Sequence, residues 1–447
     1  MKPFFSILLI FSLLACKSIP KGEVADSIYY NGNIISMEGE EEIASSIAVK
    51  EGKILAIDTK SLLPKHQGDS TKIIDLEGKT LLPGFIDAHS HISFGMAVIA
   101  MANLSSPPVG EVQNIGDILS RLKAHQEINN IPKGAWISGW GYDPDLLEEK
   151  RHPNKLDLDA IFPENPVFLT HVSGHMAVVN SVALELLDIN SHTPNPPGGM
   201  IVRLSNSEEP NGLLQETAMQ IARKALPNPN PEQAIFLMEK TQELYASHGI
   251  TTAQDGFTDY KNFQFFQQLA EAGKLILDVE ILASFVDLQD YLENHGTEFG
   301  QSKNRLRLAG VKVISDGSPQ GKTAYFRKPY LTKVPGCLHE CRGFPNLSGD
   351  QLGRIMQACY EAGIQLFTHA NGDGAIDLLL DTHQAVLDSM EQIPEDMRNV
   401  IIHSQFVRTD QLKLYKKYEM IPAYFSNHAF FWGDTHLKNL GEERANF

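Results

Sequence analysis

Short apolar runs alternate with longer amphipathic stretches along most of the chain. Seven such runs follow one another, at residues 85–87, 251–254, 277–282, 308–314, 365–368, 400–403 and 421–425. Between most of them lie helix-like segments that close on glycine before the next run, such as FQFFQQLAEAGK and LGRIMQACYEAG. Strand, helix, glycine and strand in this order are typical of parallel βα units.

The position of the polar residues decides between two parallel folds. They gather at the carboxyl ends of the apolar runs, and no glycine-rich nucleotide loop follows any run. This favours an α/β fold of the (β/α)₈ barrel type over an open doubly wound sheet. With seven runs, we expect an incomplete barrel over residues 83–447 in which strand eight is missing. The connection at about 92–248 is too long for a plain loop, so we expect an insertion that forms a lid or subdomain.

The residues before the barrel have two different patterns. Residues 27–82 contain β-rich runs broken by Asn-Gly and Glu-Gly turns, which predicts a small β-layer domain, a β-sandwich. Residues 1–15 combine a lysine with a short apolar run and end in LLA before Cys16, which resembles the signal peptide of bacterial lipoproteins. Residues 16–26 would then be a tether, and a lipid on Cys16 would be the membrane anchor at the bacterial cell envelope. The alternative is an ordinary secretory signal.

The charge balance and the cysteine content exclude some classes of protein. The 447 residues carry 55 acidic against 38 basic side chains, a net charge of −17, which argues against binding to nucleic acid. Four cysteines are too few for a disulfide scaffold. Cys337 and Cys341 flank three residues in a loop rich in glycine and proline, which indicates a loop disulfide or two unpaired thiols more than a metal site.

The candidate chemistry starts at the first barrel run, which continues into Asp87-Ala88-His89-Ser90-His91. Alternation along a strand would send His89 and His91 to the same face, where two imidazoles can bind one metal ion. Two structural histidines at a strand end are the alternative. His369 and His403 stand at the ends of two later runs, and together the four histidines favour a metal site.

Lys312 lies in the run 308–314, which has no other charge. A buried ammonium group is unfavourable unless it is paired or chemically altered. Reaction with CO₂ would turn the amine into a carbamate that can bridge two metal ions. The alternative is an ion pair with Asp316 or another carboxylate.

The order of these residues, HxH followed by Lys, His and His, resembles the amidohydrolase superfamily. The motifs LLPGFIDAHSH, PVFLTHVSGHMAVVNS, GVKVISDGS and THANGDGAID resemble its family 3, the branch of the YtcJ-like and N-substituted formamide deformylase proteins. The resemblance implies one or two divalent metal ions, Zn²⁺ first, with His89 and His91 on one and His369 and His403 on the other. It further implies a bridging carbamate on Lys312, and His175 of the insertion facing the substrate. The alternative for His175 is a capping or core histidine of the lid.

The same resemblance implies a catalytic Asp at the end of strand eight, and no residue here is assignable to that role. Asp434 is nine residues past Phe425, in a predicted loop without the Gly-Ser-Asp context of the family. We therefore expect the catalytic Asp beyond Phe447 and the chain to be C-terminally truncated, a fragment or an inactive form.

These features predict a metal-dependent hydrolase that cleaves a non-peptide, amide-type carbon–nitrogen bond of a small molecule with a metal-activated hydroxide. Another amidohydrolase reaction, such as cyclic amide hydrolysis or deamination, is an alternative. So is a noncatalytic envelope lipoprotein that binds a small ligand. The sequence leaves open the substrate and the number of metal ions. It also leaves open the oligomeric state, and a homo-oligomer is one option.

Overall fold

The computed structural model describes residues 22–39, 43–174, 176–196, 199–334, 340–392 and 395–445. The chain divides into two compact units, Met1–Phe85 and Ile86–Phe447. Cys16, His175 and Cys337 lie outside the described residues, so the lipid anchor on Cys16 and the substrate contact of His175 stay predictions.

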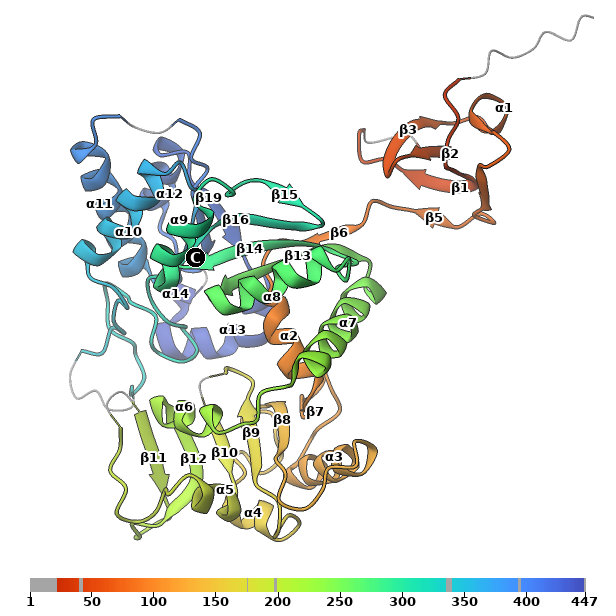
Figure 1. Cartoon of the computed structure of the whole chain (residues 1–447). Coiled ribbons are helices and arrows are strands. Elements are labelled where there is room, and N and C mark those ends of the chain that lie inside the picture. The colour runs from red at the N-terminus through yellow and green to blue at the C-terminus, as the bar shows by residue number, and fades with distance from the viewer. Residues whose placement is uncertain are drawn as a thin grey trace, which may run out of the picture. The chain divides into compact units, whose positions relative to one another are not determined.

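The first unit is built on one five-stranded sheet (Figure 1). Its strands run in the order β3-β2-β1-β4, with β5 paired to β1; they are β1 (Ser27–Ile35), β2 (Ile43–Lys50), β3 (Lys53–Asp58), β4 (Lys72–Asp75) and β5 (Thr80–Leu81). The short helix α1 (Leu63–His66) packs on one face, where Ile28, Ala48 and Leu62 are buried together. Within the described residues of this unit the five strands belong to one sheet, and the β-sandwich stays a prediction.

The second unit contains a sheet whose neighbouring strands follow chain order. The order is β6-β13-β14-β16-β17-β18-β19, with the short strand β15 (Ser302–Lys303) added antiparallel to β16. The strands are β6 (Phe85–Asp87), β13 (Ile250–Thr258), β14 (Asp278–Ser284), β16 (Leu306–Ile314), β17 (Leu366–Ala370), β18 (Val400–His403) and β19 (Ile421–Tyr424). From β13 to β19 every pairing is parallel. Each predicted run overlaps one of these strands, so the predicted barrel-type succession of parallel strands is confirmed.

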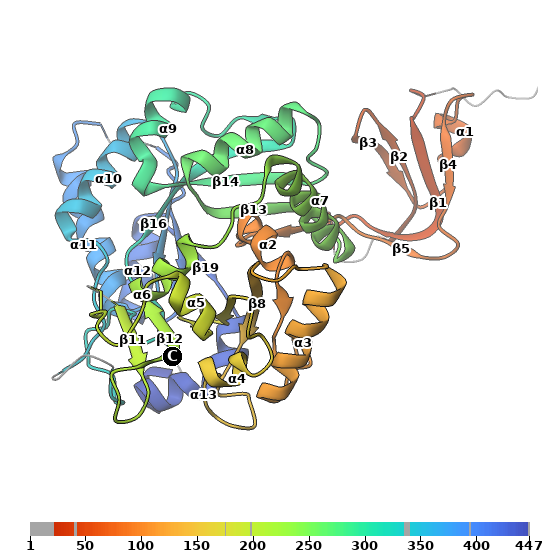
Figure 2. The same cartoon turned by 60° about the horizontal axis from the view of Figure 1, so that its bottom comes forward.

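Helices follow the strands, and those up to residue 417 connect one strand to the next and lie on the outer side of the sheet (Figure 2). They are α8 (Tyr260–Glu271), α9 (Leu288–His295), α10 (Gly349–Glu361), α11 (Asp373–Ser389), α12 (Thr409–Lys417), α13 (Asn427–Leu440) and α14 (Glu442–Ala445), with the 3₁₀ turn η1 (Phe285–Asp287) before α9. Asp259 caps α8 and Ser348 caps α10, each by accepting from a backbone N–H of the first turn. Phe266 of α8 and Val313 of β16 belong to one buried core, which fixes the helices on the sheet.

The segment between β6 and β13 carries a second sheet of its own. Its order is β11-β12-β10-β9-β8-β7, formed by β7 (Ala102–Asn103), β8 (Ile137–Tyr142), β9 (Val167–His171), β10 (Met176–Val179), β11 (Gly199–Arg203) and β12 (Pro210–Glu216). Its helices are α3 (Ile115–Ile128), α4 (Lys155–Asp159), α5 (Ser181–Leu186) and α6 (Thr217–Lys224). The flanking helices α2 (Ile92–Ile99) and α7 (Pro231–Ser247) instead place Ile92 and Met238 in the core of the parallel sheet. The separately folded part is therefore shorter than the expected 92–248.

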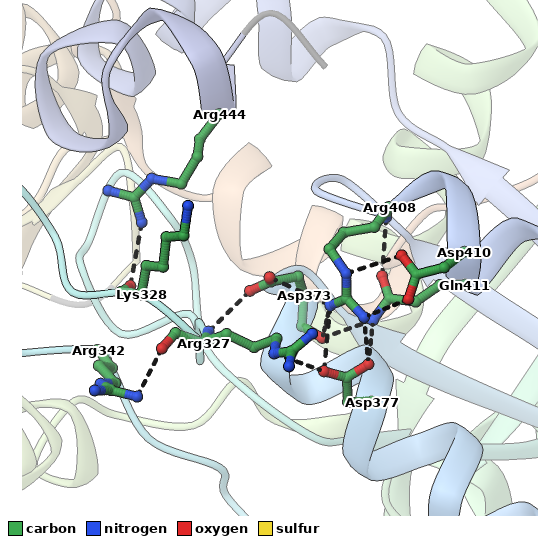
Figure 3. A network of polar contacts seen from close by, with 9 residues as sticks. All are labelled: Arg327, Lys328, Arg342, Asp373, Asp377, Arg408, Asp410, Gln411 and Arg444. Atoms are coloured by element: carbon green, nitrogen blue, oxygen red, sulfur yellow. Dashed lines mark hydrogen bonds and ion pairs between the residues drawn. The ribbon is translucent and has the colours of Figure 1, made fainter.

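A cluster of charged side chains ties α11 to α12 (Figure 3). The Arg408 guanidinium donates to the carboxylates of Asp373, Asp377 and Asp410 at 2.8–3.3 Å. The Gln411 side chain also donates to Asp377, at 2.8 Å. Bidentate arginine–carboxylate pairs are among the stronger polar contacts in proteins, so this network holds two helices of the barrel together.

The cysteines and the lengths of the helices bear on the compartment of the protein. Cys341 is disulfide-bonded, and Cys359 is free and buried. This agrees with the predicted loop disulfide, whose expected partner Cys337 is outside the described residues. Over the described ranges, the helices are all too short or too polar to cross a bilayer.

Candidate metal centre

The carboxyl ends of β16, β17 and β18 bring three of the predicted site residues together. In the sheet register Ile314 pairs with His369, and Ala370 pairs with His403, so the two histidines lie on neighbouring strands. Lys312 precedes Ile314 by two residues and points to the same side of the sheet. The sheet therefore places an amine and two imidazoles at one end of the barrel.

The four predicted histidines form a continuous group of rings. The ring centroids of His89 and His91 are 5.4 Å apart, those of His89 and His403 are 4.9 Å apart, and those of His403 and His369 are 4.8 Å apart. The HxH segment thus meets the two later histidines, although more than 270 residues of chain separate His91 from His369. The structure brings together all four histidines that the sequence singled out.

The protonation state of these rings suits metal binding. Burial, followed by the charge of Lys312, lowers the pKa of His89 and of His369 to about 3. The pKa of His91 is lowered by the same two causes, and that of His403 mainly by burial. All four imidazoles are therefore neutral near pH 7, which is the form that binds a metal ion.

The HxH segment is positioned by a loop and a neighbouring strand. β6 ends at Asp87, and His91 is the residue before α2, so strand alternation does not account for the placement of His89 and His91. The carboxylate of Asp255 on β13 accepts from the backbone N–H of Ser93 at 3.0 Å and from its hydroxyl at 2.8 Å. Asp255 also forms an isolated β-bridge with His91. Asp255 thereby fixes the start of α2 against β13.

Gly256 allows this close approach of loop and strand. Its backbone N–H donates to the carbonyl oxygen of Ser90 at 2.8 Å. A Cβ at this position would lie 2.8 Å from that same oxygen and 3.1 Å from Cε1 of His91. A side chain here would therefore displace the HxH segment.

Lys312 is 2% exposed, and burial lowers the pKa of its amine to about 7. The predicted alternative, an ion pair with Asp316, is wrong. The Asp316 carboxylate instead accepts from the backbone N–H groups of Asn371, Gly372 and Tyr325 at 2.9–3.0 Å. No ion pair joins Lys312 to a carboxylate within the described residues.

His369 and His403 are each held by their surroundings. The Nε2 atom of His369 lies 3.2 Å from the carbonyl oxygen of Gly317 and 3.5 Å from Asp316. His403 and Ser404 have φ values of 69° and 44°, in the left-handed region that residues other than glycine rarely occupy. The buried hydroxyl of Ser404 lies 2.9 Å from the hydroxyl of Tyr415, which helps to hold this conformation. Backbone strain of this kind is concentrated at functional sites.

A fifth histidine, His428, lies beside this group and was missed from the sequence. Its ring centroid is 5.0 Å from that of His403. It follows β19 on helix α13, after the last of the seven predicted strand runs. The signal that could have identified it is its place four residues after the seventh strand. Asp434, expected in a loop, lies in the same helix.

The histidine group offers donor atoms for a metal ion. Within the described ranges, no three His, Cys, Asp or Glu side chains gather their donor atoms around one point, and the rings meet edge to face instead. The donor chemistry nevertheless fits a divalent transition metal. The Nδ1 atoms of His89 and His403 are buried, and no described residue supplies either of them with a hydrogen-bond partner. A buried nitrogen of this kind needs a partner, and a metal ion would supply one.

The insertion contributes aromatic residues near the HxH segment. Phe94, three residues after His91 on α2, packs edge to face against Trp140 of β8 at 4.9 Å between ring centroids. The guanidinium of Arg223 lies 5.6 Å from the centroid of the Phe94 ring. The insertion therefore reaches α2, the helix that directly follows His91.

The chain is similar to several known proteins. A sequence model described as the amidohydrolase family matches residues 72–447. The chain is 28% identical to the protein LONG AFTER FAR-RED 3 of Arabidopsis thaliana, over 98% of this chain and 74% of that one. It is 27% identical to the N-substituted formamide deformylase of Arthrobacter pascens, over 81% of this chain and 66% of that one.

A solved structure also has a similar fold. It is an uncharacterized metal-dependent hydrolase from Pyrococcus horikoshii OT3, with a TM-score of 0.69 and 26% identity, over 94% of this chain and 78% of that chain.

Proposed function

The chain belongs to the amidohydrolase family, and from this premise we propose that it is a metal-dependent hydrolase of small molecules. Its reaction in this proposal is the cleavage of an amide-type, non-peptide carbon–nitrogen bond. One observation carries the proposal: four neutral imidazoles meet beside a buried, unpaired amine at the carboxyl ends of parallel strands. In barrels of this type the active site lies at that end.

The metal ligands in this proposal are His89, His91, His369 and His403, with Zn²⁺ as the first candidate among one or two divalent ions. The ion, when bound, polarises an amide carbonyl and makes a water molecule acidic enough to supply hydroxide near pH 7. The protein's own residues orient the ligands. Asp255 holds the start of α2, and Asp316 holds the backbone that follows His369.

Lys312 would carry a CO₂-derived carbamate in this proposal. An amine must be neutral to attack CO₂, and the burial of Lys312 favours the neutral form. The product is an anionic carboxylate, which would bridge two metal ions and remove the unfavourable burial of an ammonium group. The absence of a carboxylate partner for Lys312 among the described residues supports this role.

The amide-type substrate is proposed from a relative. The similar protein of Arthrobacter pascens is named an N-substituted formamide deformylase, and such an enzyme cleaves a carbon–nitrogen bond. We therefore include N-formyl and N-acyl amines first in a substrate panel. Cyclic amides and aminopurines test the alternative amidohydrolase reactions.

The experiment is a metal analysis joined to an activity assay. Protein purified without a histidine tag should contain one to two divalent metal ions per chain, and His89→Ala and His403→Ala should lose most of that metal. His192→Ala is the matched control, because His192 is exposed in a loop of the insertion. Amide hydrolysis that disappears with chelator and returns with Zn²⁺ supports the proposal. Wild-type protein without metal, or hydrolysis indifferent to chelator, would refute it.

We also propose that a lipid on Cys16 anchors the protein in a bacterial cell envelope. The LLAC sequence supports this, and the disulfide at Cys341 fits an oxidising compartment. Cells fed an alkyne-labelled fatty acid should label the wild-type chain, while Cys16→Ala should stay unlabelled. Labelling that persists in Cys16→Ala would contradict the anchor.

A further inference from the structure

Helix α13 presents a row of polar aromatic side chains from one face. His428, Trp432 and His436 are each four residues apart, so they lie on the same side of the helix. His436 is buried, and both of its ring nitrogens lie 3.4 Å from the side-chain nitrogen of Gln405, just after β18. This face is therefore turned toward the loop that follows His403.

His428 lies at the start of this row and beside the histidine group. Its ring centroid is 5.0 Å from that of His403, with an angle of 50° between the rings. The charge of His428 would lower the pKa of His89, His369 and His403, so it lies within electrostatic range of three predicted ligands. His428 differs from the four predicted ligands in its position: it lies within a helix, α13, which follows β19.

His428 differs from His436 in the hydrogen bonding of its ring. Its Nδ1 atom is buried, and among the described residues no hydrogen-bond partner reaches it. A ring nitrogen that is removed from water without a partner is unfavourable, and such groups are rare unless a ligand satisfies them. The absence of a partner is thus evidence that a bound molecule supplies one.

His428 also contacts an apolar side chain, that of Phe425. The ring of Phe425 lies 5.0 Å from His428, 6.2 Å from His403 and 6.4 Å from His89, and Phe425 is 36% exposed. Phe425 and His428 together form a wall next to the imidazoles, with one apolar surface and one hydrogen-bonding group. Binding sites for small organic molecules commonly have this composition.

We propose that His428 is a substrate-contacting residue whose ring N–H donates a hydrogen bond to the amide oxygen of a substrate held beside His403. This rests on the proposed function. An amide oxygen gains negative charge as hydroxide adds to the carbonyl carbon, so a donor placed there binds the transition state more tightly than the ground state. We do not count His428 among the four ligands, because its ring contacts the group at His403 alone within the described residues.

Two substitutions separate the hydrogen bond from packing. His428→Phe keeps an aromatic ring of similar size and removes the donor, whereas His428→Gln keeps a donor on a flexible side chain. His192→Gln, on an exposed loop, is the control. Circular dichroism melting of each variant shows whether the fold is kept.

The probe is acetohydroxamate, a small amide-like chelator whose carbonyl oxygen can accept from His428. Its binding to cobalt-loaded protein is followed by visible absorption, and the metal content of each variant is measured by mass spectrometry. We expect equal metal content in all variants and a Kd about five to ten times higher in His428→Phe, the range expected for one lost hydrogen bond. His428→Gln should stay within about twofold of wild type.

The outcomes distinguish this proposal from the proposed function. Wild-type protein that takes up no metal would overturn both. Metal-loaded protein in which His428→Phe binds acetohydroxamate like wild type would overturn only the role of His428. Loss of metal in His428→Phe and His428→Gln would also overturn it, because His428 would then be a ligand.

Discussion

Replacing Lys312 by methionine should make the metal-free protein more stable. Methionine has nearly the length of lysine and can fill the same space without a charge. Burial lowers the pKa of Lys312 from 10.5 to about 7. At about 1.4 kcal/mol for each pKa unit, the charged amine is disfavoured in the folded protein by up to about 5 kcal/mol. Lys312→Met removes this penalty, so the free energy of unfolding at pH 7 should rise by several kcal/mol.

The effect of Lys312→Met on the free energy of unfolding should depend on pH. Between pH 7 and 10.5 the unfolded chain binds a proton at Lys312 and the folded chain does not, so the stability of the metal-free wild type rises with pH in this range. The stability of Lys312→Met does not rise with pH for this reason, because methionine does not titrate. The difference between the two proteins should therefore be largest at pH 7 and shrink toward pH 10.

The assay is urea unfolding followed by tryptophan fluorescence, in chelator-treated protein and CO₂-free buffer, at several values of pH from 7 to 10. Lys261→Met on the exposed side of α8 is the control, and we expect no pH-dependent change from it. A stability difference at Lys312 that does not vary with pH, or a less stable Lys312→Met at pH 7, would refute the reasoning. In metal-loaded protein the same variant should instead lower metal content.

Three other changes test parts of the fold and site. Arg408→Met should lower the free energy of unfolding by about 1–2 kcal/mol in urea titrations, because Asp373 and Asp410 lose their ion pair and Asp377 keeps only the longer one with Arg327. An unchanged value would show that the network adds nothing to stability. Burial lowers the pKa of His383 to about 4, and its Nδ1 lies 2.7 Å from the Tyr360 hydroxyl. The unfolded chain therefore takes up a proton first as pH falls from 6.5 to 4, and His383→Gln should reduce the acid loss of stability by up to about 3 kcal/mol; equal acid sensitivity in melting curves would contradict this. Gly256→Ala should lower metal content in mass spectrometry by displacing Ser90 and the HxH segment, and full metal content would show that the loop can adjust.

The parallel strands could be predicted from the sequence because each is a short apolar run between amphipathic helices. The run 308–314, for example, became β16 with its ends moved by two residues or fewer. The same reasoning located Lys312, His369 and His403, since each stands in or at the end of such a run. A strand with parallel neighbours on both sides is buried on both faces, so its apolar run is easy to recognise and fixes the position of each residue in it.

Other features depended on tertiary contacts that local patterns do not contain. His89 and His91 lie in the right place, but a loop held by Asp255 positions them, and strand alternation does not. The partner of Asp316 could not be told from spacing, because its carboxylate turns toward backbone N–H groups of two distant segments. His428 was missed because its place beside the group depends on the contact of its ring with that of His403, which the sequence does not show.

The central claim, a metal centre built from histidines at the end of the parallel sheet, can be tested by X-ray absorption at the zinc edge of the untagged, zinc-loaded protein. The account predicts nitrogen and oxygen ligands at about 2.0–2.1 Å, with the outer-shell scattering of several imidazoles. The same spectrum should lose imidazole scattering in His403→Ala. Zinc held by sulfur at about 2.3 Å, or by water without imidazole, would contradict it.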